Sequence, residues 1–318
     1  MPKFEIQPHI LKKKHQDYPE FSTPVFRTPT ERFSNIDDWE FPGSTTETLS
    51  GFSGLKLHYV DVGQNSRRRT ALCLHGQKTW SYAFRKTIPY LLADSYRVIA
   101  PDFFGFGKSD KLMADKAYSF EFHRDTILAL IDELGLENIT VIGFDWGAWL
   151  GATLPLDIPN KIKALLLGNT MLPQNGFETW PGFHLWKSIQ NAQTNPSIGE
   201  SLTDGNNLSQ ATMDAYEAPF PTAEYKAAIR RFPNLVPVHE VDPLSLRTSK
   251  AVAHLNMNWN GHCVCVAGMR DNQLGHKTMS KIQSNVRNAA KLIKVQNAGS
   301  LVFEHADAFM PKALKYLR

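Results

Sequence analysis

An aspartate between two spaced glycines has the setting of a nucleophile. The stretch GFDWG at residues 143–147 follows the β-branched run 138–142 and precedes residues 149–154, whose pattern predicts a helix. Glycines two residues before and two after the central residue let the backbone turn sharply between a strand and a helix that pack closely. The side chain of Asp145 would then stand above the edge of a sheet. A helix cap for a helix that starts at Trp146 is the alternative interpretation of this aspartate.

A second carboxylate, Asp271, follows a later strand-like run at residues 263–269. A carboxylate nucleophile forms an ester, and hydrolysis of that ester needs a base that activates water. With Asp145 as the nucleophile and Asp271 as the acid that orients the base, a histidine is expected after the last strand, residues 291–295. The chain has Ala298-Gly299-Ser300 in that place.

These residues lie in a regular alternation of strands and helices. Apolar runs predict buried strands, an alternating run predicts a half-exposed strand, and helical spacing predicts three helices besides that at residues 149–154. The pattern therefore predicts an α/β fold with a mostly parallel, doubly wound sheet, which binds ligands at the carboxyl ends of its strands. The buried strands are expected at residues 70–74, 96–100, 138–142 and 163–168, the half-exposed strand at 55–62, and the helices at 80–93, 120–135 and from Glu304 to the end.

Residues 173–241 interrupt this alternation with prolines, polar loops and short helical pieces. An insertion of this size is more often a lid over a site than a linker. We therefore expect a helical cap at residues 173–241 within a core formed by residues 26–172 and 242–318. Residues 1–25 are polar and rich in basic side chains and prolines, which predicts a mobile N-terminal extension.

Composition argues against several other classes of protein. The net charge of +4 is spread out, and the basic runs at residues 12–14 and 67–69 do not indicate a nucleic-acid groove. No stretch is apolar for long enough to cross a membrane, and the N-terminus does not have the pattern of a secretory signal. The three cysteines, Cys73, Cys263 and Cys265, fall in apolar runs, which indicates buried reduced thiols. We expect a cytoplasmic monomer that needs no metal and no cofactor.

The chain resembles the haloalkane dehalogenases, which are α/β-hydrolases with the chain order nucleophile, acid and histidine. It looks most like the subfamily whose acid follows the penultimate strand. The resemblance runs from about Arg27 to the C-terminus, and the Phe-rich and Gly-rich loop Ala100–Asp110 makes it highly specific. Further matching motifs occur at residues 75–76, 79–82, 120–124, 145–147, 182–183, 186–187, 219–221, 231–233, 259–261 and 268–271.

This resemblance assigns roles to several residues. Asp145 would displace halide from an sp³ carbon, and the indole N–H groups of Trp146 and Trp186 would bind the halide. Phe183, one helical turn before Trp186, would line the same pocket. The backbone N–H groups of Gln77 and Trp146 would form the oxyanion hole. An ordinary aromatic residue of the lid core is the alternative interpretation of Trp186.

The chain departs from the family pattern at the base. The family has Ala-Gly-His where this chain has residues 298–300 (AGS), and a serine hydroxyl cannot accept the proton of water at pH 7. His305 lies five residues after Ser300, in the expected last helix, and we do not expect it to reach the site. His75 is expected to support the loop beside the oxyanion hole, and His123 to be a hydrogen-bonded structural histidine.

A second departure lies beside the expected oxyanion hole. Gln77 stands where related enzymes of this subfamily have a carboxylate, and Lys78 stands where a proline is usual. The two changes alter the electrostatics of the loop, since Lys78 adds positive charge close to the site.

The leading hypothesis is a haloalkane dehalogenase-like hydrolase that takes a small halogenated hydrocarbon, releases halide and uses water. Its ester would form on Asp145, and hydrolysis of the ester would be slow or absent because of Ser300. A non-catalytic small-molecule binder of the same fold is the second hypothesis, and it predicts no covalent adduct. An epoxide hydrolase is a weaker alternative, because it needs acidic groups in the lid, where Tyr216 and Tyr225 are the candidates.

Overall fold

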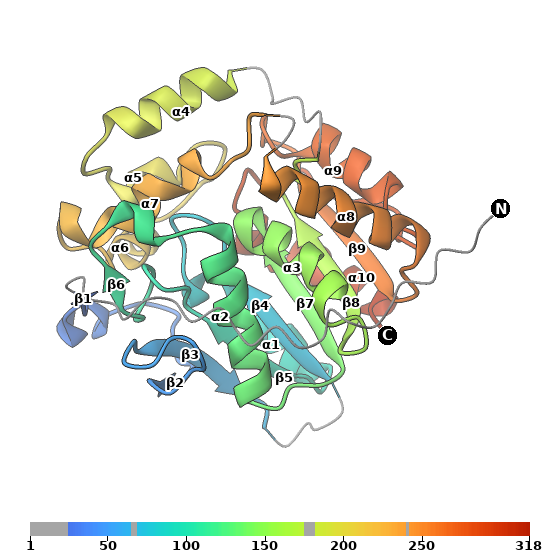
Figure 1. Ribbon diagram of the computed structural model, residues 1–318, viewed down its shortest axis with the longest axis horizontal. Helices are drawn as coiled ribbons and strands as arrows, with labels where there is room; N and C mark the ends of the chain where they lie inside the picture. The colour runs from blue at the N-terminus through green and yellow to red at the C-terminus, as the bar shows by residue number, and fades with distance from the viewer. Residues whose placement is uncertain (1–24, 65–68, 175–181, 240–241) are drawn as a thin grey trace.

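The computed structural model describes residues 25–64, 69–174, 182–239 and 242–318. An eight-stranded sheet crosses the molecule in the order β10-β9-β8-β7-β4-β5-β3-β2 (Figure 1). The strands from β10 to β5 are parallel, whereas β3 and β2 are antiparallel to their neighbours, so the predicted mostly parallel sheet is confirmed. The strands are β2 (Gly43–Thr46), β3 (Leu57–Val62), β4 (Thr70–Leu74), β5 (Arg97–Pro101), β7 (Ile139–Phe144), β8 (Ile162–Gly168), β9 (His262–Gly268) and β10 (Ile293–Val295).

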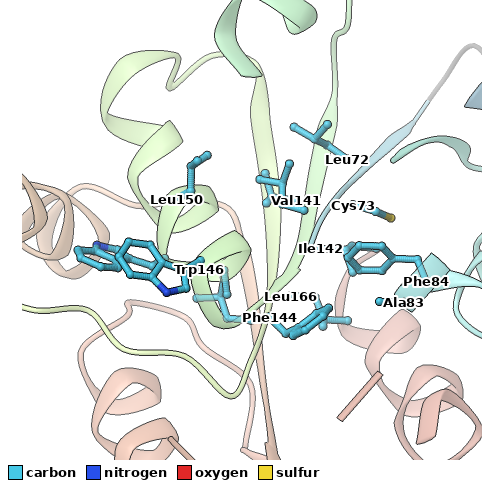
Figure 2. Close-up of a cluster of buried hydrophobic side chains, with 14 of the residues drawn as sticks. Leu72, Cys73, Ala83, Phe84, Val141, Ile142, Phe144, Trp146, Leu150 and Leu166 are labelled. Carbon is cyan, nitrogen blue, oxygen red and sulfur yellow. The ribbon is translucent and has the colours of Figure 1, made fainter. Parts of the chain in front are cut away.

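The central strands are buried on both faces because both faces of the sheet are covered. Every residue of β4 and β7 is buried. Side chains alternate along a strand, so neighbouring residues of β7 pack in different layers. Figure 2 shows Val141 on the side of Leu150, and Ile142 on the side of Phe84. The apolar runs of the sequence therefore become the middle layer of a three-layer core.

Helices form the outer two layers. In Figure 1, α2, α3 and α8 lie in front of the sheet, and α1 and α10 lie behind it. The indole Nε1 of Trp149 donates to Thr248 Oγ1 at 2.9 Å and joins two of the front helices. The bounds of the helices outside the lid are α1 (Ile88–Ala93), α2 (Phe120–Glu133), α3 (Asp145–Asp157), α8 (Pro243–Met257), α9 (His276–Ser284) and α10 (Ala306–Tyr316).

Short helices fill the chain between β8 and α8, and they gather on one side of the molecule, at the upper left of Figure 1. Hydrogen bonds attach this segment to the core: Trp80 Nε1 donates to Ala215 O at 3.0 Å, and Tyr216 Oη donates to Glu304 Oε1 at 2.6 Å. We propose that this segment, residues 173–241, is the expected helical cap, or lid. Its helices are α4 (Phe183–Ala192), α5 (Ile198–Ser201), α6 (Gln210–Glu217), α7 (Ala227–Arg231) and the 3₁₀ turns Ala223–Lys226 and Phe232–Asn234.

Some predicted elements differ from the structure. The strand at residues 55–62 is not half-exposed: it forms β3, between β2 and β5, and the first four residues of β3 are buried on both faces of the sheet. Residues 80–93 form the 3₁₀ turn Ser81–Phe84 followed by α1, in which a proline occupies the first turn. The final helix is divided into the 3₁₀ turn Val302–His305 and α10. Sequence reasoning assigned no element to α8, α9, β2, or the small antiparallel pair of β1 (Val25–Phe26) and β6 (Lys111–Leu112).

Two predictions fall wholly or mostly outside the described residues, namely the N-terminal extension and the basic turn at residues 67–69. The predicted burial of Cys73, Cys263 and Cys265 is confirmed, and all three are free thiols. In the described part of the chain, each helix is too short or too polar to cross a lipid bilayer.

Replacing Gly147 with alanine should destabilise the fold strongly. A Cβ at this position would lie 2.0 Å from the backbone oxygen of Leu74, so β4 and α3 would have to separate. We expect the free energy of unfolding to fall by about 3 kcal/mol or more, measured by urea denaturation. The control is Ala152→Gly in the same helix, which should cost about 1 kcal/mol through helix propensity. An equal loss of unfolding free energy in the two variants would contradict the close approach of β4 and α3.

Candidate active site

Asp145 stands at the turn from β7 into α3, as the glycine spacing predicts. Its φ of 52° lies in the left-handed region, which is costly for a residue with a side chain. Hydrogen bonds hold this conformation: the backbone N–H of Asp145 donates to Asn169 O at 3.0 Å, and Thr170 Oγ1 donates to the backbone oxygen of Asp145 at 2.6 Å. The structure therefore fixes the direction in which the carboxylate leaves the backbone.

Two backbone N–H groups hold the carboxylate of Asp145. That of Gln77 donates to Oδ2 at 2.8 Å, and that of Trp146 also donates to the carboxylate. The pKa of Asp145 is raised to about 6: burial raises it most and the charge of Asp271 adds to this, whereas the two N–H groups and Lys78 act in the opposite direction. The carboxylate is thus ionised at neutral pH but poorly solvated.

A cavity of about 560 Å³ opens over this carboxylate. It brings together most of the predicted site residues, from the core loops and from the lid. They line one space although they are far apart in the sequence, because the carboxyl ends of the parallel strands meet beneath the lid. The described residues that line it are Gln77, Lys78, Phe144, Asp145, Trp146, Met171, Trp186, Gln190, Gln193, Ser201, Leu202, Asp204, Val236, Arg270, Asp271, Asn272, Gln273, Leu274, Ser300 and Leu301.

The two predicted halide-binding indoles both border this cavity. Trp146 is buried, and its ring packs 4.8 Å from that of Trp149 and 4.7 Å from that of Phe232. Trp186 comes from α4 of the lid. Phe183 does not line the cavity as predicted. It is fully buried behind Trp186, with its ring 5.9 Å away, because helix α4 turns this face toward the lid core.

Asp271 lies after β9 and is held by three donors. Asn169 Nδ2 donates to Oδ2 at 2.7 Å, and the backbone N–H groups of Gln273 and Leu274 donate to Oδ1 at 2.8 and 2.9 Å. Asn169 also donates to the backbone oxygen of Gly299 at 3.1 Å. Asn169 was not predicted from the sequence. Its position directly after β8, beside the ends of β7 and β9, could have indicated a polar residue of the site.

Ser300 borders the cavity but makes no contact that would make it a base. Its hydroxyl accepts a hydrogen bond from Asn206 Nδ2 at 3.2 Å, and Asn206 Oδ1 accepts from the backbone N–H groups of Gly299 and Leu301 at 3.2 and 3.3 Å. Asn206, between β8 and α8, therefore holds the loop at Ser300, the predicted position of the base. Within the described chain no histidine lines the cavity, and His305 ends the 3₁₀ turn that precedes α10.

Lys78 is a cation of the cavity wall. Its side chain is 9% exposed, and burial lowers its pKa to about 8, although the charge of Asp145 acts in the opposite direction. Its φ is 66°, so a second residue at this site adopts the left-handed conformation. The predicted change in the electrostatics of this loop thus comes from the amine of Lys78.

The histidines outside the cavity differ from one another. His75 Nε2 accepts from the backbone N–H of Phe103 at 3.0 Å, Nδ1 donates to Gly76 O at 2.8 Å, and burial lowers the pKa of His75 to about 4. We propose that His75 supports the loop, as the sequence suggests. His123 was predicted to be hydrogen-bonded, which is wrong: neither nitrogen has a partner among the described residues, and the ring stacks 5.8 Å from Tyr118. Burial lowers its pKa to about 3.

A metal site is absent from the described residues, since no cluster of three or more His, Cys, Asp or Glu side chains could hold an ion there. The charged groups of the cavity wall are Lys78, Asp145, Asp204, Arg270 and Asp271. A buried, ionised carboxylate thus faces a cavity that indoles also line. The site contains this carboxylate, held by two backbone N–H groups, two indoles and a second carboxylate, and no imidazole among the described lining residues.

Comparison with known proteins places this site in context. Residues 71–210 match the family described as having the alpha/beta hydrolase fold. A haloalkane dehalogenase of Psychrobacter cryohalolentis is 39% identical over 224 residues, which is 70% of this chain and 74% of that protein. A haloalkane dehalogenase of Mycolicibacterium paratuberculosis is 33% identical over 255 residues, 79% of this chain and 84% of that protein.

Solved structures agree with the α/β-hydrolase fold. The tetrameric haloalkane dehalogenase DpaA from Paraglaciecola agarilytica NO2 superposes with a TM-score of 0.89 at 32% identity, covering 92% of this chain and 98% of that one. The haloalkane dehalogenase DbeA from Bradyrhizobium elkani has a TM-score of 0.71 at 23% identity, covering 86% and 96%, and shows the fold alone. The expected monomer gains no support from the tetrameric neighbour.

Removing the charge of Asp145 should stabilise the protein at alkaline pH. A carboxyl whose pKa rises from 3.8 to about 6 on folding destabilises the folded state when ionised, and this penalty disappears as the pH falls from above 6 toward 4. We therefore expect Asp145→Asn to raise the free energy of unfolding at pH 8 by roughly 2 kcal/mol more than at pH 4. Urea denaturation at both pH values measures the difference, and an equal effect at the two would contradict the burial of a charged group.

Proposed function

The chain belongs to the haloalkane dehalogenase family, and we propose that it is a hydrolase that cleaves carbon–halogen bonds by attack of Asp145 on the carbon. The observation that carries the proposal is the buried Asp145 carboxylate, which faces a cavity lined also by the indoles of Trp146 and Trp186. The proposed nucleophile and the proposed halide-binding indoles thus border the same cavity. The substrate class that suits it is a small halogenated hydrocarbon.

In the first step, a carboxylate oxygen of Asp145 forms a bond to the substrate carbon while the carbon–halogen bond breaks and its electron pair leaves with the halide. Negative charge moves from the carboxylate to the halide. Poor solvation of Asp145 favours this movement, because little hydration is lost when the carboxylate becomes an ester. The N–H groups of Trp146 and Trp186 would stabilise the departing halide without competing as nucleophiles.

In the second step, water adds to Cγ of the Asp145 ester, and the alcohol leaves. Negative charge then develops on the ester carbonyl oxygen. The backbone N–H groups of Gln77 and Trp146 already hold the carboxylate, so they would stabilise this oxyanion without reorganisation.

We further propose that the second step is slow at neutral pH. Water attacks an ester efficiently when a base removes its proton, and the position of the base is Ser300, whose hydroxyl cannot act as one. Asp271 keeps its three donors and has no imidazole to orient. The expected result is an enzyme that alkylates itself and releases its product slowly.

The geometry gives no support to the epoxide hydrolase alternative. Tyr216 Oη donates to Glu304, and the ring of Tyr225 stacks 5.0 Å from that of Phe26. Neither tyrosine lines the cavity over Asp145. A non-catalytic binder remains the alternative, and the appearance of a covalent adduct decides between the two.

Incubation with 1-bromobutane at pH 7 should give a stable covalent adduct. We expect the intact protein to gain one butyl group, with about one bromide released per protein molecule, because alkylation is followed by slow hydrolysis. Intact-protein mass spectrometry and a bromide assay measure the two quantities. Asp145→Asn is the matched control and should give neither. Absence of both adduct and bromide in the unmodified chain would leave the binder as the better account.

Replacing Ser300 with histidine should accelerate hydrolysis of the adduct. A general base contributes about 10²–10⁴-fold, so we expect the adduct of Ser300→His to disappear at least roughly 100-fold faster at pH 7, with continuous bromide release. Ser300→Ala is the control and should behave like the unmodified chain. An adduct that persists equally in all three proteins would show that the loop at Ser300 is not the place of the base.

A further inference from the structure

Lys78 is a buried group of the cavity that the proposed reaction does not use. Its side chain is 9% exposed and lines the same space as Asp145. Within the described chain its amine has no hydrogen bond and no ion pair. An amine in the wall of a cavity, with no partner on the protein, has its hydrogen-bonding capacity available to water or a ligand in that cavity.

The backbone at Lys78 supports the same conclusion. Residues 76–79 form a tight turn in which the backbone N–H and the hydroxyl of Thr79 donate to Gly76 O at 3.3 and 2.8 Å. Lys78 is the third residue of this turn, and its φ of 66° is a conformation that glycine or asparagine adopts more readily. Unfavourable backbone conformations of this kind concentrate at functional sites.

The turn also places Lys78 beside the nucleophile. Gln77, the preceding residue, donates its backbone N–H to Asp145, and the charges of Lys78 and Asp145 act on one another. The other charged groups that line the cavity are Asp204 from the lid, and Arg270 and Asp271 after β9. Burial lowers the pKa of Lys78 to about 8, so a large share of this side chain is a neutral amine in mildly alkaline solution.

The remaining groups of the cavity are poorer acceptors for the proton of water. Both oxygens of Asp271 already accept hydrogen bonds, Asp204 is exposed to solvent, and Ser300 offers only a hydroxyl. A neutral lysine amine has a free electron pair, and its flexible four-carbon stem lets it approach a water molecule. Among the described residues that line the cavity, Lys78 is therefore the group whose chemistry best suits it to accept this proton.

We propose that the neutral amine of Lys78 is the base that activates water for hydrolysis of the ester at Asp145, a role that rests on the proposed function. The amine takes one proton from water while the water oxygen bonds to Cγ of Asp145. The bond from Cγ to the alkoxy oxygen then breaks, and the leaving oxygen takes the proton from Lys78 to form the alcohol. The carboxylate of Asp145 is regenerated, and the second proton of the water passes to solvent.

The test follows loss of the butyl adduct, by intact-protein mass spectrometry, from pH 6 to pH 10 after excess 1-bromobutane is removed. The rate should rise through about pH 8 and then level off as Lys78 loses its proton. In Lys78→Met the levelling should disappear, and the rate at pH 9 should fall by roughly 100-fold, the lower end of what a general base contributes. Lys108→Met is the matched control, because burial lowers the pKa of Lys108 too, but its amine lies over the ring of Phe33 and not in the cavity.

Lys78→Arg distinguishes a role of Lys78 as a base from a role as a fixed positive charge, because a guanidinium keeps its charge and cannot accept the proton. We expect it to be as slow as Lys78→Met. Hydrolysis by Lys78→Arg at the rate of the unmodified chain, or a rate that falls above pH 8, would overturn the proposal in favour of charge stabilisation. Unchanged hydrolysis in Lys78→Met would also overturn it.

Two other outcomes would contradict the proposal in recognisable ways. A protein lighter by one water molecule after the alcohol has left would show that Lys78 attacks the ester directly and forms an amide with Asp145. Absence of the initial bromide release would contradict the proposed function itself, and the proposed role of Lys78 depends on that function. An intact bromide release in every Lys78 variant confirms that the fold and the first step survive the substitutions.

Discussion

The burial of one carboxylate governs this site. Asp145 is removed from water above the carboxyl end of β7, and two backbone N–H groups, from Gln77 and Trp146, replace part of its hydration. The close packing of β4 against α3 at Gly147 makes this geometry possible. A carboxylate in this setting remains charged at neutral pH, which the proposed attack on carbon requires. The sheet, the elbow and the lid can all be understood as the means of holding it there.

The lid and the core are joined through polar side chains as well as through packing. Asn169 ties the loop after β8 to Asp271 and Gly299, and Asn206 ties the lid to the loop around Ser300. Hydrogen bonds therefore hold the loop around Ser300, which we propose is the position of the base. We propose that the chain keeps the framework for hydrolysis but lacks the histidine that the framework would position, and that Lys78, which lines the same cavity, acts as the base.

Much of the fold was predictable because it depends on local patterns. Apolar runs located the parallel strands, and spaced glycines located Asp145 at its turn. The burial of residues 57–60 on both faces of the sheet was not predictable, since it depends on segments that are distant in the sequence, as in the hydrogen bond of His58 to Asp102. The inward orientation of Phe183, and the contacts of Asn169 and Asn206, also arise from packing between distant segments. The burial of Lys78 belongs to the same class, because its type suggests a solvated charge.

The most direct test of the central claim is to locate the alkyl group after a single exposure to 1-bromobutane, by fragmentation of proteolytic peptides in a mass spectrometer. The account predicts that the butyl group is found on Asp145 and that its amount equals the bromide released. Butyl groups on the cysteines or on Lys78, with Asp145 unmodified, would contradict it, because bromide would then come from adventitious alkylation and not from attack by the buried carboxylate.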